Sequence, residues 1–61
     1  MKSVTITIRT ENAAFQPDPG HELARLLRNV AEMMNRGVDA EDWQTRLFDF
    51  NGNHVGEITT T

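Results

Sequence analysis

The stretch from Pro19 to Gly37 constrains the fold of this chain more than any other segment. Its apolar residues recur at steps of three and four, the spacing of one face of an α-helix. This apolar stripe consists of Leu23, Leu26, Leu27, Val30, Met33 and Met34. Asp18 suits the N-cap before a proline at the first helical position, and Gly37 suits the closing position. The pattern predicts one amphipathic helix whose apolar face builds the core.

The segment from Lys2 to Thr10 has the two-residue period of a β-strand. Val4, Ile6 and Ile8 alternate with polar residues, which predicts a strand with one buried and one solvated face. The connection to the helix contains one large apolar residue, Phe15, which we expect to pack beneath the start of the helix.

A β-hairpin is predicted for the end of the chain. The dipeptide Asn51-Gly52 favours a tight turn between two strands, at 43–50 and 54–60. We expect the tail at 59–61 to be frayed.

Two hairpin registers are compatible with this turn. A two-residue loop, which we favour, pairs Arg46 with Glu57 across the strands. A three-residue loop, with Gly52 in the left-handed conformation, shifts the pairing by one residue, so that Leu47 meets Val55. In the favoured register three apolar side chains share a face and form a candidate interaction surface: Phe48, Phe50 and Val55.

The order strand, helix, strand, strand predicts a single small α+β domain over residues 1–61. We expect one helix packed on one face of a three-stranded sheet. Either the third strand is central and the sheet is antiparallel, or the second is central and pairs in parallel with the first through a right-handed crossover. We expect the antiparallel arrangement, because such a sheet tolerates a solvated face.

Composition excludes several classes of protein. The chain has no cysteine, which rules out disulfides and thiolate metal sites, and its formal net charge of −3 disfavours broad affinity for nucleic acid. The sequence contains neither a stretch long enough to cross a membrane nor a signal-peptide pattern, so we expect a cytoplasmic location. Because so short a chain lacks covalent staples, a homodimer is an open prediction.

The candidates for site chemistry are weak. Asp49, Asn51 and Asn53 alternate as at the start of an EF-hand loop, but His54 and Thr60 stand where that loop needs Gly and Glu. Asp49 and His54 are expected to be cross-strand neighbours without a nearby nucleophile, and hence a surface ion pair. We read the acidic cluster of Asp39, Glu41 and Asp42 as a solvated loop and not as a cation site, with Asp39 as the cap of a short helical turn. We therefore predict a non-enzymatic chain without catalytic residues, a cofactor or a metal.

An alternative prediction uses the polar side of the helix. Arg25, Arg28 and Arg36 lie there and would give a small nucleic-acid-binding regulator, although Glu22 and Glu32 interrupt them.

Three segments carry a resemblance that spans nearly the whole chain: TENAAF, PGHELARLLRNVAEMM and FDFNGNHVGEI. Together they resemble very short hypothetical proteins of bacteriophages and prophages. The resemblance implies an accessory protein that acts inside a bacterial cell, and it brings no catalytic residue. The leading prediction is a non-enzymatic protein-interaction module that binds a protein partner or a second copy of itself.

Overall fold

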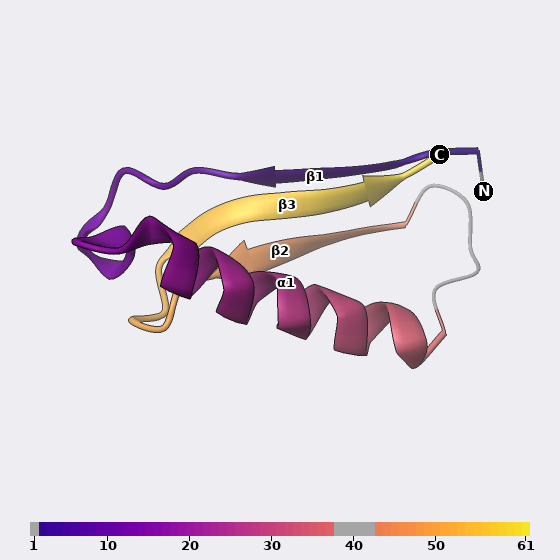
Figure 1. Cartoon of the computed structure of the whole chain (residues 1–61). Helices are drawn as coiled ribbons and strands as arrows, with labels where there is room; N and C mark the ends of the chain where they lie inside the picture. Colours follow the sequence, from indigo (N-terminus) through magenta and orange to yellow (C-terminus); the bar gives the residue numbers. More distant parts are fainter. Residues whose placement is uncertain (1, 38–42) are drawn as a thin grey trace.

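The structure is a computed structural model that describes residues 2–37 and 43–61. Its elements, in chain order, are β1 (Val4–Ile8), the 3-10 helix η1 (Ala13–Phe15), α1 (Pro19–Asn35), β2 (Gln44–Phe48) and β3 (His54–Thr60). The strands form one antiparallel sheet in the order β1-β3-β2, and α1 lies along one side of it (Figure 1). This confirms the α+β fold and the central third strand. The acidic cluster at 39–42 lies outside the described residues.

The ends of α1 follow the local sequence signals. The Asp18 side chain accepts a hydrogen bond from the His21 N–H at 3.4 Å and caps the first turn. The helix ends at Asn35, and Gly37 follows with a φ of 108°, a left-handed conformation that favours glycine. One member of the predicted stripe is not in the core, because Leu27 is 49% exposed on the edge of the apolar face.

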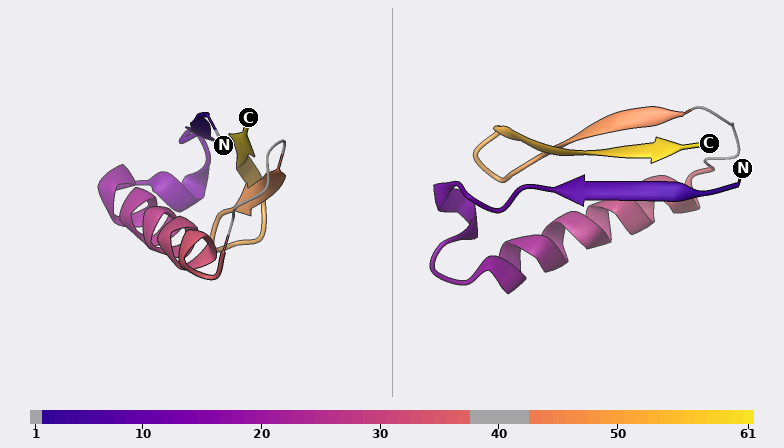
Figure 2. Two further views of the ribbon diagram at one scale, coloured as in Figure 1. Left: turned by 90° about the vertical axis from the view of Figure 1, so that its right-hand side faces the viewer. Right: turned by 90° about the horizontal axis from the view of Figure 1, so that it is seen from above.

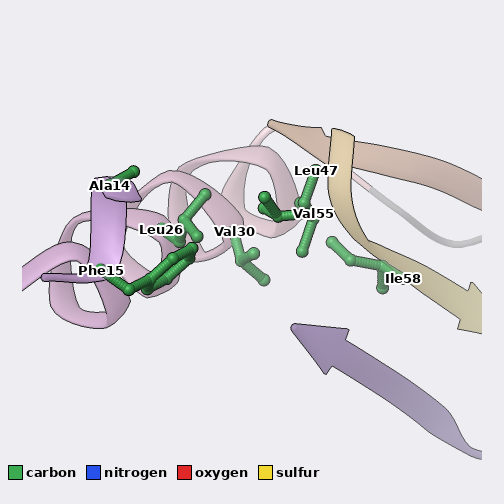
Figure 3. Packing of buried hydrophobic residues seen from close by; sticks show 7 residues of the cluster. All are labelled: Ala14, Phe15, Leu26, Val30, Leu47, Val55 and Ile58. Atoms are coloured by element: carbon green, nitrogen blue, oxygen red, sulfur yellow. The ribbon is translucent and has the colours of Figure 1, made fainter. Parts of the chain in front are cut away.

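The core joins η1, the middle of α1 and the hairpin. Figure 3 shows Phe15 lying against Leu26 in the middle of the helix, while Val30 faces the hairpin residues. The buried apolar cluster consists of Ala14, Phe15, Leu26, Val30, Leu47, Val55 and Ile58. Phe15 is fully buried, which confirms its predicted position beneath the helix. Complete burial of such a side chain stabilises a fold by about 1.5–3 kcal/mol.

The helix covers β1 only in part. Val4, Ile6 and Ile8 share the face of their paired residues on β3, as predicted, but Val4 is 42% and Ile6 40% exposed. Figure 2 shows the reason, because α1 runs obliquely to the strands. The expectation that this whole face of the strand is buried is therefore wrong.

The end of the chain is ordered, contrary to the prediction of a frayed tail. Thr60 is buried, and the Thr61 N–H donates to the Ser3 carbonyl at 3.1 Å. The Ser3 N–H donates back to the Thr61 carbonyl at 3.3 Å. This reciprocal pair extends the contact of β1 with β3, which explains why the last residues do not fray.

The hairpin turn has three residues, so the favoured two-residue loop is wrong at the turn. The Gly52 N–H donates to the Asp49 carbonyl at 3.0 Å, and the Asp49 N–H donates to the Asn53 carbonyl at 2.9 Å. Gly52 has a φ of 85°, the left-handed conformation that this loop requires.

A β-bulge then restores the favoured register further along the strands. The pairing shifts between Leu47 and Phe48, so that Leu47 lies opposite Gly56 and not opposite Val55. Arg46 consequently lies opposite Glu57, as the two-residue loop predicted. The extra residue is Val55, and the bulge turns its side chain into the core.

Candidate functional site

A buried carboxylate on the helix holds the hairpin in place. Glu22 is 2% exposed and accepts hydrogen bonds from Arg25 at 2.7 and 2.8 Å and from the backbone N–H of Phe50 at 2.9 Å. Arg25 also donates to the Phe48 carbonyl at 3.2 Å. The bonds from Arg25, opposed by burial and aided by the Phe50 N–H, hold the pKa of Glu22 below its ordinary value. The first turns of α1 are thereby fixed to the hairpin.

A second buried carboxylate organises the turn itself. Asp49 is 4% exposed and accepts the backbone N–H groups of Asn51 and Asn53, each at 2.9 Å. The side-chain amide of Asn12 donates to it at 2.7 Å, and Asn12 also caps η1. Burial disfavours the charged form, but the hydrogen bonds from Asn53, Asn12 and Asn51 outweigh it and lower the pKa of Asp49. The alternating residues Asp49, Asn51 and Asn53 thus form the hydrogen bonds of the hairpin turn.

The hairpin that Glu22 and Asp49 hold in place leaves two aromatic side chains outside the core. Phe48 is 46% and Phe50 64% exposed. The Phe48 ring lies against the His54 ring, with centroids 5.8 Å apart and planes tilted by 47°. Val55 is 3% exposed and is not available to this surface, because the bulge turns it inward. The predicted surface of Phe48, Phe50 and Val55 therefore keeps only its two aromatic members.

Polar groups continue the site on the face of the sheet opposite the helix. Glu57 accepts a bidentate pair of bonds from Arg9 at 3.0 and 3.3 Å, and it lies 3.2 Å from the His54 Nε2. The bonds from Arg9 are the main reason that the pKa of Glu57 is lowered. Phe48 pairs with His54, so the predicted pairing of Asp49 with His54 is wrong.

A shallow open depression runs along this face. Six residues line it: Gln44, Thr45, Arg46, Phe48, His54 and Glu57. Arg46 makes no hydrogen bond or ion pair within the described ranges and lies opposite Glu57. We define the hairpin surface as Arg46, Phe48, Phe50 and His54, which combines aromatic area with an uncommitted cation.

The three arginines of the alternative hypothesis differ in their contacts. Arg25 is committed to Glu22 and to the hairpin, and Arg36 lies 3.7 Å from Glu32 on the exposed side of the helix. Arg28 has no ion pair in the part of the chain that the structure describes.

The burial of Glu22 had no signal in the sequence. Its spacing from Arg25 predicts that the two meet, but it also fits a solvated helix face. The burial depends on the Phe50 N–H, which lies 28 residues away in the chain.

Among the described residues, no three or more His, Cys, Asp or Glu side chains are grouped so that they could hold a metal ion. None of the described helices combines the length and apolarity needed to cross a membrane. Comparisons with protein-family models, curated proteins and solved structures find no match to this chain.

Proposed function

We propose that this chain is a non-enzymatic protein-interaction module that contacts a protein partner through the hairpin surface. One observation carries the proposal: Phe50 is 64% exposed at a turn that Glu22 and Asp49 hold from inside. Large aromatic side chains dominate the energetics of protein interfaces. Because the turn is already fixed by hydrogen bonds, little backbone freedom is lost when it binds a partner.

The chemistry of the surface defines the partner. The exposed rings of Phe48 and Phe50 fit an apolar pocket or groove on the partner, and the guanidinium of Arg46 fits a carboxylate beside that pocket. The resemblance to phage and prophage proteins supports an accessory role inside a bacterial cell. The nucleic-acid alternative has weaker support, because the formal net charge is −3 and Arg25 is committed to Glu22.

The test compares Phe50→Ala with Arg28→Ala, which truncates a long exposed side chain on the helix. Proteins captured from a bacterial lysate by the tagged chain are purified, and their affinity is measured by calorimetry. We expect Phe50→Ala to raise Kd about 30-fold, the effect of losing an interface hot spot. Arg28→Ala should leave Kd within about twofold, because it lies outside the hairpin surface.

The proposal would be refuted by two results. One is that no captured protein distinguishes the unchanged chain from Phe50→Ala. The other is that Arg28→Ala abolishes binding while Phe50→Ala does not, which would move the contact to the helix. Circular dichroism of each variant checks that the fold is retained, as we expect from the exposure of both side chains.

A further inference from the structure

Within residues 2–37 and 43–61, no strand pairs with the outer edge of β1. Ser3 exchanges backbone hydrogen bonds with Thr61, and the Arg9 N–H donates to the Val55 carbonyl at 2.7 Å. Because backbone groups of an antiparallel strand point alternately to its two edges, the N–H and C=O groups between these residues alternate as well. The groups that point away from β3 belong to the apolar residues of the strand: Val4, Ile6 and Ile8.

The two edges of the sheet differ in their protection. β1 reads VTITI, without a charge or proline, and its pairing with β3 runs without a register shift. β2 carries the charged Arg46, its pairing with β3 is interrupted by the bulge at Val55 of β3, and the carbonyl of Phe48 accepts a hydrogen bond from Arg25. Charges and bulges are the devices that prevent unwanted pairing at sheet edges. Among the described strands, only the β2 edge has a charged residue and an interrupted pairing with β3.

We propose that a second copy of this chain pairs with β1, antiparallel and with Ile6 opposite Ile6 of the second copy. Val4 then lies opposite Ile8, and each such pair exchanges two backbone hydrogen bonds. Antiparallel pairing of identical strands requires a twofold axis perpendicular to the sheet. Both helices therefore lie on the same face of one continuous six-stranded sheet.

This symmetry brings together the aliphatic side chains that one copy leaves uncovered. Val4 and Ile6 are 42% and 40% exposed, on a strand that α1 crosses obliquely (Figure 2). Leu27 lies on the side of α1 turned away from the hairpin contacts of Glu22 and Arg25.

The contact area sets the strength of the dimer. A standard interface buries about 800 Å² per partner, and the whole chain exposes 4309 Å². A five-residue edge with three partly exposed aliphatic side chains is smaller than the standard. We therefore expect a dissociation constant of about 1–100 µM. This dimer does not use the hairpin surface, so it is independent of the proposed function.

Sedimentation equilibrium from about 1 µM to about 1 mM should show a monomer–dimer transition in this range. Ile6→Lys places a charge at the centre of the seam and should raise the dissociation constant about 100-fold or more. Phe50→Lys changes the net charge equally but lies at the exposed hairpin. It should leave the dissociation constant within about twofold.

Hydrogen exchange on the unchanged chain tests the register without any substitution. The amides of Val4, Ile6 and Ile8 should exchange more slowly as concentration rises, whereas those of Thr5 and Thr7, already bonded to β3, should not change. Val4→Pro removes one outward N–H and should also weaken the dimer. If Ile6→Lys fails to fold, as judged by circular dichroism, the exchange pattern decides.

The inference is overturned by a strict monomer at about 1 mM. It is also overturned if the amides of Val4, Ile6 and Ile8 exchange independently of concentration. A dimer that Phe50→Lys disrupts and Ile6→Lys spares would place the contact at the hairpin instead.

Discussion

Replacing Glu22 by Gln is expected to destabilise this fold far more than replacing Glu32 by Gln, which removes an exposed charge from the same helix. The carboxylate is 2% exposed and accepts both bonds of Arg25 as well as the Phe50 N–H. Gln keeps one oxygen for the Phe50 N–H but loses the charge, and its amide group presents N–H donors to the guanidinium. The variant therefore leaves Arg25 without its ionic partner.

The size of this loss of stability depends on how exposed the side chains of Glu22 and Arg25 are. Breaking a fully buried ion pair costs about 3–5 kcal/mol, and a hydrogen bond to a charged group contributes about 1.5–3 kcal/mol. The Arg25 side chain is 36% exposed and can turn to water, which places the loss at the lower end. We expect about 2 kcal/mol, or a Tm lower by about 8–16 °C for a domain of this size. This is a large part of the stability of a 61-residue chain, about 3–9 kcal/mol.

The assay is urea and thermal denaturation at one protein concentration, because self-association would couple stability to concentration. Glu32→Gln is the matched control, since it removes the same charge from the same helix. Its partner Arg36 is 3.7 Å away and both side chains are largely exposed, so its loss should be below about 0.5 kcal/mol. Equal losses for the two variants, or a loss below about 0.5 kcal/mol for Glu22→Gln, would refute the reasoning.

Two further predictions concern the stability of the chain at low pH and the effect of a substitution in the central strand. The folded chain lowers the pKa values of three carboxyl groups: Glu22, Asp49 and Glu57. Their contribution to the free energy of unfolding is therefore present above about pH 4 and is lost as pH falls through those lowered values. Urea midpoints should be flat from neutrality to about pH 5 and then fall, and a midpoint that stays level to about pH 2 would contradict this. Gly56→Ala would overlap the Thr7 carbonyl oxygen and should cost about 3 kcal/mol or more in thermal denaturation. Gly20→Ala meets only the flexible Asp18 side chain and should change stability by less than about 1 kcal/mol; equal stabilities for the two variants would show that this close approach of β1 and β3 is absent.

Local patterns were sufficient to predict the α-helix and the three strands of this fold, but not the 3-10 helix η1. The stripe from Leu23 to Met34, with Asp18 before it and Gly37 after it, defined the helix, because periodicity and capping depend on residues within a few positions of each other. The alternation of Val4, Ile6 and Ile8 defined β1 in the same way. The order of the elements allowed two sheets, and the antiparallel one with β3 in the centre was expected because it tolerates a solvated face.

The composition of the candidate site was decided by contacts between distant parts of the chain. A three-residue turn and a bulge combine to preserve the pairing of Arg46 with Glu57 while moving Val55 from the predicted surface into the core. Two shifts that cancel in the register leave no signature in the sequence pattern. The exposed aromatic pair was therefore predictable, but its third member was not.

Contacts between distant parts of the chain also decide whether a charged residue is buried and how much of an apolar face is covered. Glu22 has the position and charge of a solvated helix residue in the sequence, and it is buried only because the hairpin folds back onto it. Ile6 has the pattern of a core residue and stays 40% exposed because α1 crosses the sheet at an angle. Periodicity determines which face of an element is apolar. The angle and position at which the elements pack determine how much of that face is covered, and these depend on side chains far apart in the chain.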